Sequence, residues 1–249
     1  MQKRETVYLF PHTSLKIPEE IKYMADEYTL GYVNEYMCDM YVDKLFGDID
    51  NEHCVKAEVS RLAVDVERFE DDFKEVMAAA GMGVIYKRDH LGGLLRDPSD
   101  MGVTREYLID TYYKPYHDRV RRLTEKHLEN ADEVLLVDCH SFSRDILYTS
   151  YYPDQFPDIC IGTDNCHTPM KLLSDVVEIF ERSGYNTKLN VPFSGCYIPD
   201  VYYEKDNRVK GIMIEINKRV YLDSSNEMRE GAARIKNTLT TVMEYLKEN

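Results

Sequence analysis

The chain has 249 residues, of which 43% are hydrophobic and 31% charged, a composition typical of a soluble globular protein with a sizeable core. Its formal net charge of −14 argues against nucleic-acid binding, which normally uses a basic surface. No apolar run approaches the roughly twenty residues that cross a membrane, so we expect no membrane partner. The length fits one large domain over residues 1–249.

The six cysteines form no CxxC pair. In a chain of this size they are typical of reduced thiols rather than of a disulfide framework. The first five residues carry no targeting signal. We therefore expect a cytoplasmic protein.

The first half of the chain predicts a strand followed mainly by helices. Residues 6–10 (Thr-Val-Tyr-Leu-Phe) indicate the first strand. Apolar positions at three- and four-residue spacing across 19–46 predict one or two helices. Residues 81–86 indicate a turn that enters a strand. The stretch 104–130 indicates a helix that Pro115 starts, kinks or interrupts.

The second half alternates strands with helices. Strands are predicted at 134–137 and 211–216, with an extended segment at 188–191. An amphipathic helix is predicted over 170–182, and the capping-box pattern of 224–227 predicts the start of a final helix. The apolar positions of that final helix would be Met228, Ala232, Ile235, Leu239, Val242 and Leu246.

This alternation favours an α/β fold in three layers, with a mostly parallel or mixed central sheet and helices on both faces. No internal repeat, low-complexity tract or linker interrupts the sequence.

The apolar run 134–137 leads into Asp138-Cys139-His140-Ser141. Polar residues at the carboxyl end of a buried strand face the ligand crevice of an open α/β sheet. An Asp-x-His at this position suits a metal ligand or a general base, with Asp138 orienting the ring of His140.

His12 comes just after the first expected strand and so occupies the same kind of position as His140. A single histidine of this kind is more often structural. Two histidines at equivalent strand ends can meet in one crevice, and catalytic zinc commonly takes three protein ligands and leaves a position open for water.

Glu215 interrupts the apolar strand predicted at 211–216. A buried charge costs several kcal/mol unless it is paired or used. Two interpretations are equally supported. Glu215 forms a salt bridge with Lys218 or Arg219, or it is the general base that activates a water.

Two further segments carry polar groups of the kind that bind substrates. Residues 60–68 contain two arginines, and a guanidinium binds carboxylates in bidentate fashion, although most arginines are solvated surface. The loop 190–199 begins at a strand end and contains a glycine, as an ordinary turn also would.

These segments, in this order, resemble the N-formylglutamate amidohydrolase family. Each motif alone is weak, but seven in the right order are fairly specific, and they run from residue 11 to about residue 223. The motifs are PHTSLKIP (11–18), DMYVDKLF (39–46), SRLAVDVER (60–68), YKPYH (113–117), DCHS (138–141), NVPFSG (190–195) and EINKRVYLD (215–223).

The family is related to the zinc carboxypeptidase-like hydrolases, so the resemblance implies a zinc-exopeptidase-like fold and one Zn²⁺ ion. The implied ligands are His12, His140 and an acidic third residue, for which Asp39 is the first choice and Asp43 the second. Such a ligand set also accepts manganese, iron or cobalt.

The resemblance also implies roles in hydrolysis. Glu215 would take a proton from the attacking water and return it to the leaving amine, and His117 would polarise the carbonyl or hold the shape of the site. The substrate would be a small anionic acyl-amino acid, with N-formylglutamate as the first candidate and, with it, a place in histidine degradation. The implied substrate-binding residues are Arg61, Arg68, Asn190 and Gly195.

The chain departs from the family pattern at Ser14, Glu67, Cys196 and Lys218. Glu67 and Lys218 lie in segments expected to touch substrate. They keep a second hypothesis open, in which the same metal site cleaves another N-acyl amino acid, a peptide or a cell-wall amide. A third hypothesis is a non-catalytic binding protein on this fold.

Overall fold

The computed structural model describes residues 3–143 and 156–248. The chain divides into two compact units. We call residues 1–10, 41–55 and 120–249 the sheet unit, and residues 11–40 and 56–119 the loop unit. Each unit is described by itself, and a single domain over the whole chain stays a prediction.

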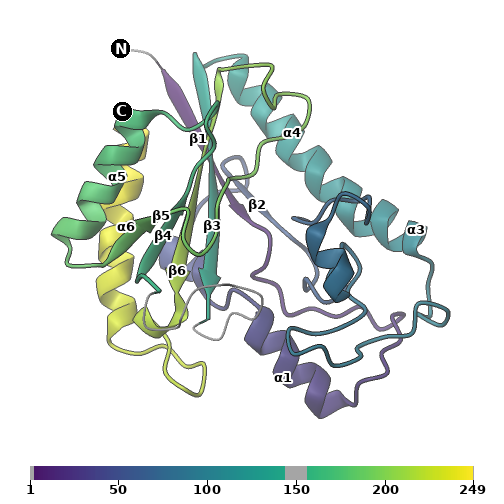
Figure 1. Cartoon of the computed structure of the whole chain (residues 1–249). Coiled ribbons are helices and arrows are strands. Elements are labelled where there is room, and N and C mark those ends of the chain that lie inside the picture. The colour runs from purple at the N-terminus through teal and green to yellow at the C-terminus, as the bar shows by residue number, and fades with distance from the viewer. Residues whose placement is uncertain (1–2, 144–155, 249) are drawn as a thin grey trace. The chain divides into compact units, whose positions relative to one another are not determined.

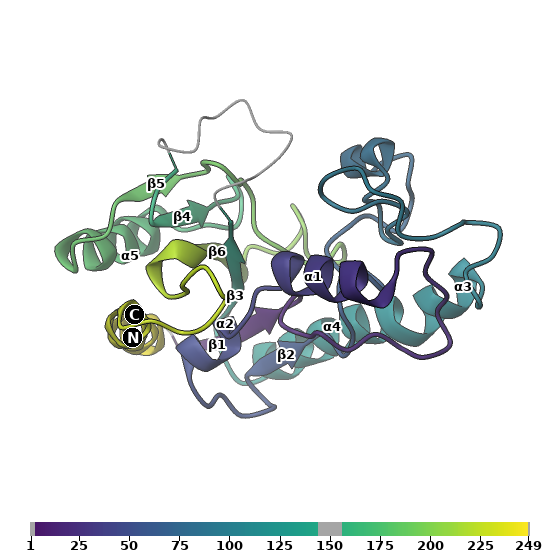
Figure 2. The same ribbon diagram turned by 90° about the horizontal axis from the view of Figure 1, so that it is seen from below.

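The sheet unit is built around a six-stranded mixed sheet in the order β2-β1-β3-β6-β4-β5 (Figure 1, Figure 2). Strands β1, β3 and β6 are mutually parallel, β4 runs antiparallel to β6, and β5 is parallel to β4. The strands are β1 (Arg4–Phe10), β2 (Cys54–Lys56), β3 (Glu133–Phe142), β4 (Ile159–Gly162), β5 (Thr187–Leu189) and β6 (Val209–Asn217).

Helices cover both faces of this sheet. Helices α2 (Val42–Phe46), α5 (Met170–Arg182) and α6 (Gly231–Glu248) lie on one face, and the part of α4 (Lys114–Leu128) that belongs to the sheet unit lies on the other (Figure 1, Figure 2). Covered faces explain why β3 and β6 are buried along almost their whole length. The three-layer α/β prediction is therefore confirmed.

Both long helices of the first layer bury an apolar stripe at helical spacing. Helix α5 has the predicted bounds, and Gly184, with φ +82°, follows its end. Its buried residues are Leu172, Leu173, Val176 and Phe180. Helix α6 buries five of the six predicted positions, Ala232, Ile235, Leu239, Val242 and Leu246.

The predicted start of that last helix is wrong. Helix α6 begins at Gly231, and the capping-box residues belong to a turn before it. Asp223 organises this turn, because its Oδ1 accepts hydrogen bonds from the backbone N–H groups of Ser225 (2.8 Å) and Glu227 (3.1 Å). Met228 therefore lies outside the helix and is 42% exposed.

The loop unit contains little regular structure. Its elements are α1 (Glu27–Met37), a 3₁₀ turn η1 (Val76–Ala80), α3 (Arg105–Leu108), a π-helical turn η2 (Ile109–Tyr113) and the first residues of α4. The π turn directly precedes the helix that contains Pro115, so the expected interruption of the helical stretch 104–130 is confirmed.

The strand predicted at residues 81–86 is wrong. Val84, Ile85 and Tyr86 are buried, but in two apolar clusters of the loop unit. Their segment has no strand partner among the described residues, and the carbonyl of Val84 instead accepts the backbone N–H of Asp65 at 2.9 Å. The segment is apolar because it is buried, as a strand would be, but its described residues make no backbone pairing with another strand.

Side-chain bonds to the backbone hold the loops of this unit together. Arg96 is completely buried, and its Nη2 donates to the Tyr23 hydroxyl at 2.9 Å and to the carbonyl of Leu62. Its guanidinium also lies 4.7 Å from the centre of the Tyr23 ring. One buried cation thus links three separate loop segments.

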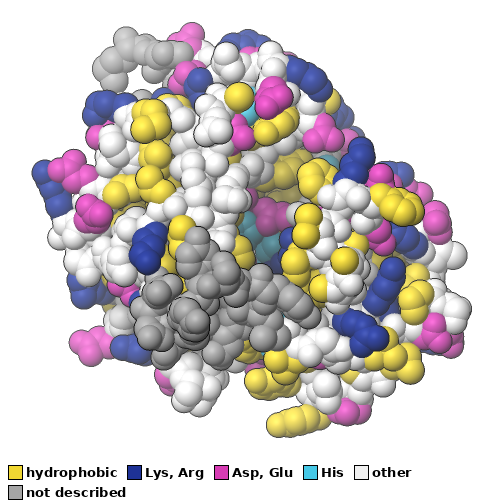
Figure 3. All heavy atoms as spheres, in the orientation of Figure 1, with side chains coloured by type: hydrophobic (Ala, Val, Ile, Leu, Met, Phe, Trp, Pro, Cys, Tyr) yellow, Lys and Arg dark blue, Asp and Glu magenta, His cyan; other side chains and the backbone are white. Residues whose placement is uncertain are grey.

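In the described part of the chain, no helix has both the length and the apolar character needed to span a membrane. On the face shown in Figure 3, basic and acidic side chains are interspersed. The negative net charge is therefore not gathered into one acidic patch on this face.

Candidate functional site

The sheet unit places a histidine and an aspartate on the same face of its central strand. Asp138 and His140 are two residues apart on β3, so their side chains point the same way. The Nε2 of His140 lies 3.0 Å from Oδ1 of Asp138, and Oδ2 of Asp138 accepts the backbone N–H of Tyr197 at 3.2 Å. The predicted orientation of His140 by Asp138 is confirmed.

The strand is longer than the sequence suggested. β3 continues through Phe142, so His140 lies within the ladder and not beyond its end. The polar residues do not stop the pairing, because His140 is matched with Glu215 and Phe142 with Asn217 on β6. Side-chain polarity does not end a strand whose backbone groups remain paired.

Glu215 is 7% exposed and pairs with His140 in the register of β3 and β6. Paired residues of neighbouring strands point to the same face of the sheet. Arg219 is engaged elsewhere, because its Nη2 donates to Oδ1 of Asp158 at 3.0 Å. The sheet therefore presents an acid beside a histidine.

The loop after β5 is tied to the end of β4. Asn190, at φ +55°, donates from Nδ2 to the Thr163 hydroxyl at 2.8 Å and accepts the Thr163 backbone N–H at 2.9 Å. Gly195 has φ +88°, a conformation that favours glycine. A Cβ on Gly162 would lie 2.2 Å from the carbonyl oxygen of Gly195, so Gly162 permits the close approach of this loop.

The loop unit is organised around Asp65, whose side chain is completely buried. Its Oδ1 lies 2.8 Å from Nε2 of His12, and its Oδ2 accepts hydrogen bonds from Nη2 of Arg61 (2.8 Å) and from the Tyr86 hydroxyl (2.7 Å). Oδ1 also accepts the backbone N–H of Glu67 at 3.0 Å. A carboxylate with this many donors remains charged although it is buried.

The other nitrogen of His12 faces two carboxylates. Its Nδ1 lies 3.6 Å from Oδ2 of Asp39 and 3.8 Å from Oε2 of Glu67. The backbone N–H of Asp39 also donates to the carbonyl of His12 at 2.9 Å. The second choice for a carboxylate ligand, Asp43, lies in α2 of the sheet unit.

The pKa values of this network follow from its charges. Burial alone would raise the pKa of Asp65, but Arg61 and His12 hold it well below 3.8. Burial and Arg61 act to lower the pKa of His12, and Asp65 and Asp39 outweigh them and raise it above 6.5. Burial raises the pKa of Tyr86 to about 12. Tyr86 is therefore a neutral donor, and the carboxylates around His12 favour the protonated form of its ring.

The two candidate arginines differ in how far they are engaged. Arg61 donates to Asp65 from both Nε (3.2 Å) and Nη2 (2.8 Å), and its Nη1 contacts the carbonyl of Met37 at 3.5 Å. Arg68 is 25% exposed and makes longer ion pairs, 3.7 Å to Asp65 and 3.8 Å to Glu75. Of the two, Arg68 has more capacity to bind another carboxylate.

His117 lies in the part of α4 that belongs to the loop unit. Its ring centre is 4.2 Å from that of Tyr113 and 5.5 Å from that of Tyr116. Contacts with these two aromatic rings restrict the direction of the imidazole.

The sequence alone indicates no role for Asp65 or Tyr86, and it places Glu67 only in a segment expected to touch substrate. A signal for Asp65 was present, because it lies four residues after Arg61 and three before Arg68. Nothing in the sequence indicated Tyr86, which reaches Asp65 only through the loop packing described above.

Each unit thus holds a histidine whose Nε2 is engaged by a buried aspartate, Asp138 with His140 and Asp65 with His12. Histidines that bind metals almost always have this second contact, which fixes the tautomer and leaves the other nitrogen for the ion. Imidazole and carboxylate donors of this kind suit a metal of the zinc class.

The chain is similar in sequence to known proteins. The family model "N-formylglutamate amidohydrolase" matches residues 4–222. A curated relative, the N-formylglutamate deformylase of Pseudomonas putida, is 27% identical over 177 residues, which are 69% of this chain and 64% of the relative. The match therefore spans slightly less than two thirds of that relative's length.

Two solved structures are similar to this chain in fold. The N-formylglutamate amidohydrolase of Ralstonia eutropha superposes with a TM-score of 0.83 at 18% identity, covering 100% of this chain and 94% of the other. A gene product of Agrobacterium tumefaciens gives a TM-score of 0.63 at 18% identity, covering 99% and 93%. Because the family model spans most of the sequence, the chain belongs to the N-formylglutamate amidohydrolase family.

Proposed function

We propose that this protein is a zinc-dependent amidohydrolase that cleaves N-formylglutamate to formate and glutamate. The observation that carries the proposal is the pair of buried carboxylate–histidine contacts, Asp138 with His140 and Asp65 with His12. Family membership supplies the substrate as the first candidate.

In this proposal the zinc ion is bound by His12, His140 and one carboxylate. Chain connectivity supports shared binding, because His12 is the second residue after β1, and β1 pairs with β3 in the register Leu9 to Asp138. Asp39 was the carboxylate expected from the sequence. Glu67 is an equally placed alternative, since both lie within 4 Å of Nδ1 of His12.

Zinc bound here would supply Lewis acidity to the scissile carbonyl and lower the pKa of a water. Glu215 is the proposed proton carrier. It takes a proton from the attacking water as the C–O bond forms, and gives it to the amide nitrogen as the C–N bond breaks. His117, which contacts two tyrosine rings, is the proposed group that binds the carbonyl oxygen.

Substrate binding is proposed to use Arg68 for a carboxylate of the substrate, with Arg61 acting mainly through Asp65. Asn190 shapes the loop that presents the backbone of Gly195. We also propose that the enzyme works in the cytoplasm, which is consistent with six free cysteines.

One observation favours a second candidate substrate. Arg61 is occupied by Asp65, and Glu67 adds negative charge beside His12. A site of this charge suits an N-acyl amino acid with one carboxylate instead of two. The chemistry of hydrolysis would be the same.

The test is formate release from N-formylglutamate by the metal-free protein and by protein loaded with zinc, manganese, iron or cobalt. We expect activity only with metal, and we expect Glu215→Gln to bind the metal but lose at least 10²-fold in kcat. A panel of N-acyl amino acids with one or two carboxylates decides between the two substrates. Failure of every substrate together with absence of metal binding would favour a binding protein.

A further inference from the structure

We infer that the sheet unit carries a second binding site for a divalent transition-metal ion of the zinc class, formed by Glu5, His53 and His127. One oxygen or nitrogen of each side chain lies within 4.8 Å of the others. All three residues belong to the sheet unit, so the site does not depend on the loop unit or on the proposed hydrolysis.

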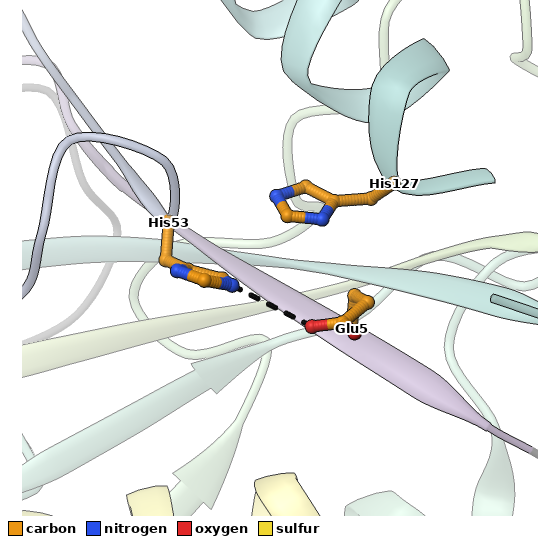
Figure 4. A group of neighbouring side chains, drawn as sticks. All are labelled: Glu5, His53 and His127. Carbon is orange, nitrogen blue, oxygen red and sulfur yellow. Dashed lines mark ion pairs between the residues drawn. The ribbon is translucent and has the colours of Figure 1, made fainter. Parts of the chain in front are cut away.

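The three side chains come from separate elements and point toward one another (Figure 4). Glu5 lies on β1, His53 immediately precedes β2, and His127 lies in the last turn of α4. The Nε2 of His53 is 3.5 Å from Oε2 of Glu5, and the two imidazole rings stack with centres 4.9 Å apart.

The hydrogen bonds of the two histidines indicate which nitrogen each would give to an ion. Nδ1 of His53 lies 2.9 Å and 3.1 Å from the two carboxylate oxygens of Asp50, and Nε2 of His127 lies 2.7 Å from the carbonyl oxygen of Glu52. In each case the acceptor requires an N–H on that nitrogen. In the neutral ring the lone pair is then on the opposite nitrogen, which is the form that binds a metal.

The third ligand is also available. The Oε1 of Glu5 contacts the Lys3 ammonium at 3.3 Å, whereas its Oε2 is the atom that faces His53. Two imidazoles and one carboxylate are a common zinc set that leaves one position open. Tetrahedral ligands at normal zinc distances lie about 3.3 Å apart, so the donor atoms, now within 4.8 Å of one another, must move closer when the ion binds.

An ion can reach this place from solvent. A cavity of about 980 Å³ is lined by Glu5 and His53 together with Asp48 and Asp50. The site is partly exposed, with 26% of the Glu5 and 35% of the His53 side chain accessible. Because the ligands join β1, the segment before β2 and α4, a bound ion would fasten one end of the sheet unit.

The first experiment counts zinc ions per chain by equilibrium dialysis and elemental analysis of tag-free, full-length protein. We expect Glu5→Gln and His53→Gln each to bind one ion fewer than the wild type. The matched control is Glu52→Gln, which removes the same charge nearby from a side chain that pairs with Lys126. We expect the control to bind as many ions as the wild type.

Asp50→Asn tests the supporting contact without removing a ligand. We expect a Kd for Zn²⁺ at this site about 10-fold weaker or more, in line with the loss of a carboxylate behind a metal-binding histidine. Formate release from N-formylglutamate is measured in parallel and should not change in any of these variants. If the wild type hydrolyses nothing, the proposed function fails, but the difference in zinc count still decides the present inference.

A second readout uses the unaltered wild-type chain. Co²⁺ should shift and broaden the ring proton signals of His53 and His127 in NMR spectra. We do not expect His167 to bind the ion directly, because both of its nitrogens are engaged, with the carbonyl of Val209 and the N–H of Glu204. Equal zinc counts in wild type and Glu5→Gln, or unshifted His53 and His127 signals, would overturn the inference.

Discussion

His140 in the sheet unit and His12 in the loop unit each have one nitrogen engaged by a buried aspartate, but the two pairs are built differently. Asp138 and His140 are two residues apart on one strand, and the β3–β6 ladder fixes their direction. Asp65 and His12 are 53 residues apart, and no strand holds either of them. Side-chain bonds from Arg61 and Tyr86 hold Asp65 instead.

This difference shows two ways to make the same local chemistry. A strand positions side chains through backbone hydrogen bonds, so the aspartate adds orientation to a ring that is already held. In the loop unit, the hydrogen bonds and ion pairs of Asp65 themselves help to hold the loops together. We therefore expect substitution of either aspartate to weaken metal binding to a similar degree. Substitution of Asp65 should lower the stability of the fold more than substitution of Asp138.

The largest expected effect comes from the histidines themselves. His12→Ala and His140→Ala should each lower kcat/KM for N-formylglutamate at least 10³-fold and reduce bound zinc. If both histidines serve one ion, the double variant will be no worse than either single variant. Multiplicative losses, or full zinc retention in His140→Ala, would show that the two histidines act separately.

Asp65→Asn, in the loop unit, should lower the free energy of unfolding more than Asp138→Asn, in the sheet unit. Arg61 and His12 would lose their buried counter-charge, which costs about 3–5 kcal/mol when one partner of a buried ion pair is removed. Asp138→Asn should cost less, about 1 kcal/mol, because the ladder remains. Urea unfolding measures both, with Asp100→Asn, from an exposed pair with Lys22, as the control. Equal losses at Asp65 and Asp138 would refute the contrast.

Low pH should destabilise the loop unit by protonating Asp65. The folded pKa of Asp65 lies well below 3.8, so its ionised form stabilises the fold. That contribution is complete above about pH 4 and is lost as the pH falls through the folded value. The free energy of unfolding of the wild type should fall with acid more steeply than that of Asp65→Asn. Parallel curves between pH 5 and 3 would contradict this.

A small effect, of the same order as that of Asp138→Asn, is expected at Tyr86. Tyr86→Phe removes one of the hydrogen bonds to Asp65 and leaves the ring in place, so we expect a loss of about 1–2 kcal/mol. The matched control is Tyr28→Phe, where the side chain is 85% exposed and should change nothing. A neutral Tyr86→Phe would mean that Arg61 and His12 suffice to hold Asp65.

The sequence predicted the sheet unit better than the loop unit, for a physical reason. The apolar runs of β3 and β6 record burial on both faces, so the strands and their polar residues His140 and Glu215 could be read locally. Residues 84–86 are also apolar but are buried among loops, and there the apolar pattern predicts a strand that does not form. Apolar composition reports burial, while a strand also needs a partner.

Local polar patterns were similarly ambiguous. Ser224 and Glu227 have the spacing of a capping box, yet Asp223 organises the turn and the helix begins at Gly231. Glu67 is a departure from the family motif in the sequence, and in the structure it is a carboxylate beside His12.

The sequence by itself determined the α/β class, the family and the placement of His140 and Glu215 on strands, because each of these depends on patterns within short segments of the chain. Only the tertiary structure decided that Asp65 is the centre of the loop unit and that His53 meets His127. Those contacts join residues from different segments. Their energies depend on burial and on mutual distance, which no local spacing records.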